Sequence, residues 1–285
     1  MSTELAGSNN SMPPELPPTG ERLHTSEHGV SMLEHLHRYA LARSLCQDRN
    51  VLDIACGEGY GSNLLAQASA RVIGVDISAD AISHAAAKYK RNNLCFVEGS
   101  ADRIPLGAGV VDIVVSFETL EHHDRHLEMI SETKRVLRPE GMLIISTPDK
   151  LHYTDLPNYL NPFHQKELYL EEFRGLLRSQ FRNVGMLLQK VVYCSLISPE
   201  TKAQGFTEYW GTYSNIGSSE MLEQQVYNIC IASDAELPEA GLSIFDGSDM
   251  LAEDIDRRVL LYANSRSYRL GRALTWPLRR LLRKS

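Results

Sequence analysis

Residues 51–62, VLDIACGEGYGS, decide the fold because they pass from an apolar strand to a glycine-rich turn and then to the start of a helix. Residues 51–55 form a short apolar run typical of a buried strand, and the glycines that follow predict a tight turn. Residues 62–70 predict a helix, and residues 71–76 predict a second strand that ends in the acid Asp76. A strand, a glycine turn, a helix and a strand in this order predict the opening of a doubly wound α/β sheet.

The same alternation continues toward residue 235. Further strands are predicted at 94–97, 110–117, 141–147, 181–192 and 225–232, and helices at 31–45 and 125–137. We therefore predict a doubly wound, mostly parallel seven-stranded α/β sheet within residues 21–235, with an insertion at about 195–223 and helical extensions at both ends. Residues 1–20 are predicted to be mobile, and residues 236–285 to form a helical, basic C-terminal extension.

Charge and composition narrow the function classes. Residues 266–285 carry seven basic side chains and no acid, so the net charge of −7 on the whole chain leaves −14 on the rest, which disfavours a nucleic acid partner. No apolar run approaches the roughly 20 residues of a membrane-spanning helix. Five dispersed cysteines without CxxC spacing favour reduced thiols and a cytoplasmic location.

Residues 50–150 resemble the class I S-adenosylmethionine (SAM)-dependent methyltransferases. The acid Asp53 precedes the turn, and the glycines stand as GxGxG rather than as the GxGxxG of dinucleotide-binding domains. The resemblance implies a Rossmann-like methyltransferase sheet that binds SAM. The implied contacts are Asp53, Ala55, Gly57 and Gly59 to the methionine part, Asp76 to the ribose, Ser100 and Ala101 to the adenine, and further contacts from Ile77 and Phe117. This chain has Ser100 where the family commonly has an acid.

The stretch FETLEHH at 117–123 places acids and histidines where the fourth strand ends. Glu118, Glu121 and His122 stand at i, i+3 and i+4, so a helical turn brings them to one face. One interpretation is a site for a divalent cation. The other is a helix start at which acids complement the dipole, Thr119 caps and the histidine packs.

A second segment, NPFH at 161–164, precedes a predicted helix that carries Leu168, Phe173 and Leu177, and it faces the same edge of the sheet. Two carboxylates and two imidazoles form a sensible shell for a metal ion. This combination resembles the metal-dependent methyltransferases, which include small-RNA 2′-O- and ubiquinone-pathway O-methyltransferases. The resemblance implies Mg²⁺ or Mn²⁺ on Glu118, Glu121, His122 and His164, with His122 and His164 also as catalytic residues.

Histidine-rich positions elsewhere receive a plainer interpretation. His123, His126 and His152 are predicted to be packed or solvated. For Arg38 and Tyr39 of the N-terminal helix, packing is favoured over contact with the SAM carboxylate.

This constellation favours methylation of oxygen, since amines need neither a metal nor a base. The C-terminal SRSYRLGRAL resembles the tails of bacterial enzymes that assemble cell-surface polysaccharides. This resemblance indicates a sugar hydroxyl of a glycan, or of a lipid-linked or nucleotide-linked glycan precursor, as the acceptor. The alternatives are RNA 2′-O-methylation, methylation of a quinone or phenol, and a noncatalytic SAM-binding scaffold. For residues 266–285 we expect either contact with the inner face of a membrane or packing within a homodimer.

Overall fold

The computed structural model describes residues 23, 30–191, 208–212, 215–219, 222, 224–239 and 242–282. The predicted mobile segment 1–20 lies outside the described residues, as does most of the insertion at 195–223.

The centre of the molecule is a seven-stranded sheet with the strand order β3-β2-β1-β4-β5-β9-β6. The first five strands run parallel, whereas β9 is antiparallel to both β5 and β6. The prediction of a mostly parallel, seven-stranded sheet is confirmed. The strands are β1 (Asn50–Ile54), β2 (Arg71–Asp76), β3 (Leu94–Glu98), β4 (Val111–Phe117), β5 (Leu137–Pro148), β6 (Asn183–Gln189) and β9 (Tyr227–Ser233).

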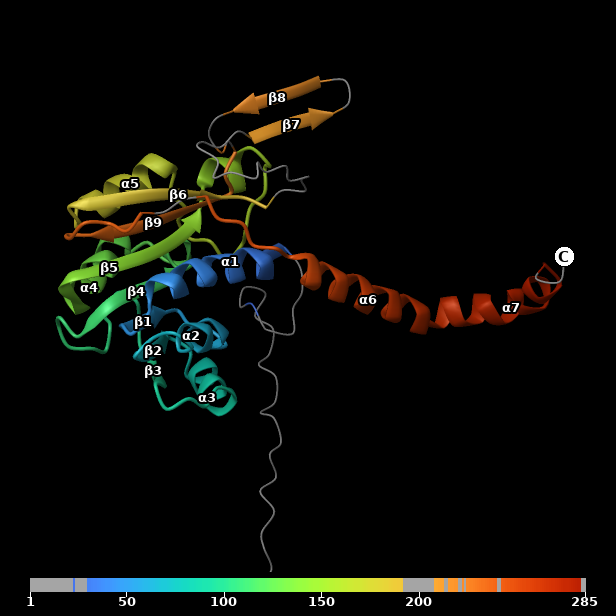
Figure 1. The fold of residues 1–285 in the computed structure, drawn as a ribbon, viewed down its shortest axis with the longest axis horizontal. Coiled ribbons are helices and arrows are strands. Elements are labelled where there is room, and N and C mark those ends of the chain that lie inside the picture. Colours follow the sequence, from blue (N-terminus) through green and yellow to red (C-terminus); the bar gives the residue numbers. More distant parts are fainter. Residues whose placement is uncertain are drawn as a thin grey trace, which may run out of the picture.

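Helices cover both faces of this sheet (Figure 1). Val51 packs in one core cluster with Met32 of α1 and Leu65 of α2, whereas Leu52 packs in another with Phe173 of α5. Neighbouring residues of one strand face opposite sides, so β1 contributes to both clusters. The helices are α1 (Val30–Leu45), α2 (Tyr60–Leu65), α3 (Ala79–Lys88), α4 (His126–Val136), α5 (Leu170–Arg178), α6 (Ser248–Asn264) and α7 (Arg266–Leu282), with a 3₁₀ turn η1 (Leu120–His122) and a π-helical turn η2 (Leu151–Asp155).

Two helices differ from the prediction. Helix α2 ends at Leu65 rather than near residue 70, because the Asn93 amide takes the free carbonyls of Ala66 and Ser69 at 2.8 and 2.9 Å. Helix α5 begins at Leu170, since Leu168 forms a parallel bridge with Asp149 instead of a helical turn.

The insertion contains a hairpin that the sequence analysis missed. Its strands are β7 (Glu208–Thr212) and β8 (Asn215–Ser219), which pair antiparallel and form a separate two-stranded sheet.

The last two helices extend away from the sheet as an arm (Figure 1). The start of the arm lies on α1, where His37 Nε2 is 2.9 Å from Ser243 Oγ and a Cβ on Gly247 would meet Leu33 at 2.6 Å. No helix among the described residues is both long and apolar enough to cross a membrane.

Candidate active site

The turn after β1 lies at the carboxyl end of the parallel strands, where this class of sheet binds its ligands. Ala55, Gly57 and Gly59 have φ values of 56°, 54° and 90°, all in the left-handed region. A Cβ on Gly59 would lie 2.7 Å from Ala85 Cβ and 2.9 Å from the ring of Phe96, so only glycine fits there. The turn therefore folds tightly against α3 while Ala55 stays exposed.

Asp76 ends the neighbouring strand β2 and is held beside this turn. Its carboxylate accepts hydrogen bonds from the backbone N–H groups of Gly57 at 2.8 Å and Ser78 at 2.9 Å. These bonds fix the acid that the sequence assigns to the ribose, and they leave the remaining oxygen lone pairs for a diol. The next residue, Ile77, is 74% exposed.

Asp53 is fully buried beneath the turn. It accepts hydrogen bonds from Ser62 Oγ at 2.6 Å and from the Tyr39 hydroxyl at 3.2 Å. Burial raises the pKa of Asp53 to about 7, although the two hydroxyl groups act in the opposite direction. In this structure the carboxylate braces α1 and α2 against β1, and its direct contact with the methionine part of SAM stays a prediction.

The remaining residues assigned to the cofactor lie in varied surroundings. Ser100 donates to Asp102, so the acid of this segment stands two residues after the position at which the family commonly has one. Ala101 packs against the core. Phe117 is buried and packs edge-on against Tyr39, with ring centroids 5.0 Å apart. The roles of Ser100, Ala101 and Phe117 in binding SAM also stay predictions.

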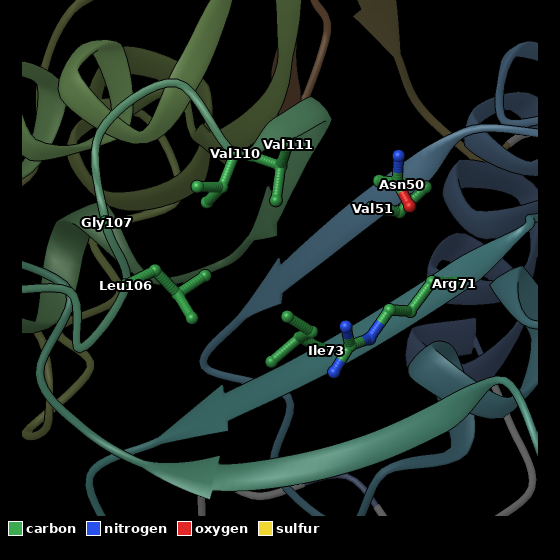
Figure 2. Close-up of a pocket in the computed structure, with 8 residues that line it drawn as sticks. All are labelled: Asn50, Val51, Arg71, Ile73, Leu106, Gly107, Val110 and Val111. Carbon is green, nitrogen blue, oxygen red and sulfur yellow. The ribbon is translucent and has the colours of Figure 1, made fainter.

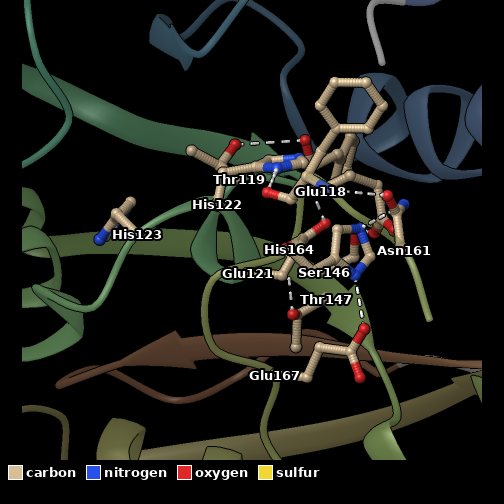
Figure 3. A network of polar contacts seen from close by, with 12 residues as sticks. Glu118, Thr119, Glu121, His122, His123, Ser146, Thr147, Asn161, His164 and Glu167 are labelled. Carbon is tan, nitrogen blue, oxygen red and sulfur yellow. Dashed lines mark hydrogen bonds and ion pairs between the residues drawn. The ribbon is translucent and has the colours of Figure 1, made fainter. Parts of the chain in front are cut away.

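A carboxylate and two imidazoles meet at the ends of β4 and β5 (Figure 3). One ligand atom from each of Glu121, His122 and His164 lies within 4.8 Å of the others. Glu121 is 1% exposed, and burial, followed by the nearby Glu118 carboxylate, raises its pKa well above the ordinary value. The site therefore consists of a solvent-shielded carboxyl group that faces two histidine rings.

Main-chain contacts explain how Glu121 and His164, which are 43 positions apart in the sequence, meet here. The Glu121 carbonyl accepts the N–H groups of Gln165 at 2.8 Å and Lys166 at 3.1 Å. His122 Nδ1 lies 3.4 Å from the Phe163 carbonyl oxygen. The loop that carries His164 is thus tied directly to the 3₁₀ turn that carries Glu121.

Glu118 lies outside this group of three. It has φ 51° and precedes η1. The prediction that Glu118, Glu121 and His122 share one helical face is therefore wrong. Its carboxylate accepts from Ser146 Oγ at 2.6 Å and lies 3.7 Å from the Arg38 guanidinium. Its assignment as a metal ligand stays a prediction.

Two residues that the sequence analysis missed orient His164. Glu167 lies 2.5 Å from Nδ1, and the Asn161 amide lies 3.0 Å from Nε2. A carboxylate on one ring nitrogen is the usual partner of a histidine that binds a metal or a proton through the other. The spacing HxxE at 164–167 was the available signal.

The other histidines lie apart from the group. His123 points away from it (Figure 3) and lies 3.3 Å from the sulfur of Met129. His126 is buried, and His152 Nδ1 pairs with Asp149 at 2.5 Å. Arg38 and Tyr39 are both buried, and they donate to Gln189 at 2.9 Å and to Asp53 at 3.2 Å. The expectation that neither contacts SAM stays a prediction.

A hollow of about 270 Å³ lies at the opposite edge of the sheet (Figure 2). Asn50, Arg71 and Val111, which begin β1, β2 and β4, line it. It is far from the residues described above, because parallel strands place their amino ends at one edge and their carboxyl ends at the other.

Comparison with known proteins agrees with this geometry. A family described as "Methyltransferase domain" matches residues 52–145. A probable S-adenosylmethionine-dependent methyltransferase of Mycolicibacterium smegmatis is 37% identical over 175 residues, which cover 60% of this chain and 66% of that protein. The chain contains a class I SAM-dependent methyltransferase domain.

Two further similarities bear on this methyltransferase domain. A fatty-acid O-methyltransferase of Mycolicibacterium smegmatis is 27% identical over 172 residues, covering 57% of this chain and 62% of that protein. A SAM-dependent methyltransferase from Archaeoglobus fulgidus superposes with a TM-score of 0.52 at 21% identity, covering 72% of this chain and 94% of that one, and shows the fold alone. The chain spans 66% and 62% of the length of these two Mycolicibacterium smegmatis proteins. It spans 48% of a probable S-adenosylmethionine-dependent methyltransferase of Mycobacterium tuberculosis.

Proposed function

We propose that this protein is a SAM-dependent O-methyltransferase whose acceptor oxygen reacts beside Glu121, His122 and His164. The observation that supports the proposal is the position of this group at the carboxyl ends of β4 and β5, next to the strands that carry the cofactor turn. The acceptor oxygen attacks the methyl carbon of SAM, and the carbon–sulfur bond breaks with its electron pair going to sulfur. The hydroxyl proton passes to a histidine.

His164 is suited to that proton transfer. The Glu167 carboxylate at Nδ1 stabilises a proton there, which leaves Nε2 as the accepting nitrogen. Asn161 donates to Nε2 in this structure, so the acceptor hydroxyl takes the place of the Asn161 amide.

The same group fits a divalent cation. A buried carboxylate and two imidazoles, with a carboxylate behind one imidazole, leave positions for acceptor oxygens. The oxygen ligands suit Mg²⁺ or Mn²⁺, and the two imidazoles favour Mn²⁺, a first-row transition metal, over Mg²⁺. When bound, such an ion lowers the pKa of the acceptor hydroxyl. Glu121, His122 and His164 would hold it. His164 Nε2 would then be a ligand instead of the proton acceptor, and the hydroxyl proton would pass to water. Thr147 Oγ1 donates to the Glu121 carboxylate at 3.1 Å and orients that ligand.

For the acceptor we propose a sugar hydroxyl of a glycan or of a lipid-linked glycan precursor. The basic C-terminal tail described above and the oxygen chemistry of the site support it. A carboxylate acceptor is the second candidate, since a relative is named fatty-acid O-methyltransferase.

Methyl transfer from labelled SAM tests the proposal. Glycan, fatty-acid, catechol and RNA acceptors are each assayed with Mg²⁺, Mn²⁺ or EDTA, for the wild type, His164→Ala and the control His123→Ala. We expect transfer to one oxygen acceptor, loss of it in EDTA and in His164→Ala, and full activity in His123→Ala. Activity that survives EDTA but not His164→Ala would reduce the group to a histidine base, and activity that survives both would overturn the proposed site.

A further inference from the structure

Four exposed apolar side chains occur in the loop that precedes His164. Leu156, Tyr159, Leu160 and Phe163 are 66%, 52%, 82% and 45% exposed, and we call these four residues the apolar rim. They lie within LPNYLNPF at 156–163, which contains no charged residue. Large apolar side chains clustered on a surface mark interaction sites more often than chance does.

The apolar rim is continuous with the candidate active site. Its inner end, Phe163, offers its carbonyl oxygen to His122 Nδ1 at 3.4 Å. The ring of Tyr159 packs against Tyr153 at 5.8 Å, and Tyr153 stacks on His164 at 5.3 Å. The loop that carries the rim therefore contacts the histidine pair directly at Phe163 and through Tyr153 at Tyr159.

Backbone hydrogen bonds order the loop that carries these side chains. The N–H of Leu156 donates to Leu151 at 2.9 Å, that of Tyr159 to Thr154 at 3.1 Å, and that of Phe163 to the Asn161 side chain at 3.1 Å. The exposure is thus a property of an ordered, hydrogen-bonded loop, and it leaves apolar area in contact with water at a free-energy cost.

We propose that the acceptor carries a hydrocarbon chain, which lies on the apolar rim while its reacting oxygen sits between His122 and His164. The proposal rests on the proposed function. The absence of charge in residues 156–163 suits a hydrocarbon and offers nothing to a polyanion, and the contacts of Phe163 and Tyr159 place the loop beside the histidine pair. Both a lipid-linked glycan and a fatty acid have this form.

Fluorescence titration with dansylaminoundecanoic acid tests the chain directly, and dansylglycine serves as the probe that lacks a chain. The variants are Leu156→Gln/Leu160→Gln and the control Leu127→Gln, which alters a residue of α4 that is 51% exposed and outside the rim. We expect the wild type and the control to bind the longer probe at least tenfold more tightly than dansylglycine, and the double variant to lose that preference. Equal affinity in all three proteins, or no preference for the chain, would overturn the proposal.

Failure of this proposal is distinct from failure of the proposed function. His164→Ala is expected to bind the longer probe like the wild type while transferring no methyl group. Chain binding without transfer to any oxygen acceptor would refute the methyltransferase proposal alone. A dimer in light scattering that becomes a monomer in Leu156→Gln/Leu160→Gln would show that a second copy covers the rim, and would overturn the lipid assignment.

A separate observation concerns α7. Residues 266–285 carry seven basic side chains and no acid, and Arg266, Arg269 and Arg272 are exposed. Leu270 and Leu274, one helical turn apart, are 63% and 71% exposed, and the sequence continues this spacing with leucines at 278 and 281.

We infer that α7 lies on an anionic membrane surface with its leucines in the lipid and its arginines among the headgroups. The charge of this helix complements an anionic leaflet, and the arm extends away from the sheet, so it reaches a surface without obstruction from the domain (Figure 1). No described helix is suited to crossing the bilayer, so the contact is interfacial.

Sedimentation with phosphatidylcholine vesicles, with and without phosphatidylglycerol, tests this inference. We expect binding only to the anionic vesicles, weakened at least tenfold in Arg269→Glu/Arg272→Glu and unchanged in the control Arg178→Glu/Arg182→Glu, which alters exposed arginines near α5. Equal binding to neutral vesicles, or undiminished binding in the α7 variant, would overturn it.

Discussion

Substituting Gly59 by alanine probes the turn on which the cofactor assignment depends. Gly59 has φ 90°, and a left-handed conformation costs an alanine about 1–2 kcal/mol. The new Cβ would lie 2.7 Å from Ala85 Cβ and 2.9 Å from the Phe96 ring, and overpacking of this kind costs about 1–3 kcal/mol. The free energy of unfolding should therefore fall by about 2–5 kcal/mol, out of about 5–15 for a typical domain.

Two other glycines separate these contributions. Gly109 has φ 64° but nothing within 4 Å of its Cβ position, so Gly109→Ala should cost only the conformational part, about 1–2 kcal/mol. Gly175 lies within α5, also with nothing within 4 Å, and Gly175→Ala should stabilise by about 0.5–1 kcal/mol.

Urea unfolding of the three variants measures these differences. If Gly59→Ala destabilised no more than Gly109→Ala, the close packing of the turn against α3 would be refuted. SAM affinity, measured by calorimetry well below the unfolding midpoint, should fall in Gly59→Ala and stay unchanged in the two controls, because only the first displaces the turn at the end of β1.

Three further predictions concern single carboxylates. Asp76→Ala should abolish measurable SAM binding in calorimetry while leaving the fold intact by circular dichroism; unchanged affinity would refute the ribose assignment. Asp53 has a folded pKa of about 7 against an ordinary 3.8, so the folded state keeps a proton that the unfolded state loses. Its stabilisation is complete below about pH 4 and is lost as pH rises toward 7, on the order of 4 kcal/mol; urea unfolding of Asp53→Asn should lack this dependence. Glu167→Gln should lower kcat about 10- to 100-fold with SAM affinity unchanged, since Glu167 acts through His164; an unaltered kcat would remove Glu167 from the site.

The parts of the fold that the sequence predicted best are those determined locally. The strand Arg71–Asp76 matches its prediction residue for residue, because an apolar run between a polar turn and an acid has one simple interpretation. The end of α2 and the start of α5 depended on partners distant in sequence, namely Asn93 and Asp149. Propensity within a window contains no information about such partners.

In the candidate site, too, one feature could be predicted from the sequence and another depended on residues distant in the chain. The proximity of Glu121, His122 and His164 followed from the rule that parallel strands share a carboxyl edge. The separation of Glu118 from this group did not, because it depends on the left-handed conformation of Glu118 and on Ser146 and Arg38, which belong to other elements.

The contacts of Glu121 explain why the candidate metal or proton site and the apolar rim occur in one place. Its carbonyl fixes the loop through Gln165 and Lys166, and its carboxyl group faces the histidines. The same loop, just upstream, displays the apolar rim, so any change that moves the rim also moves His164. In the proposed complex, one loop therefore positions both the acceptor chain and the reacting oxygen, and loss of the chain should lower kcat as well as raise KM.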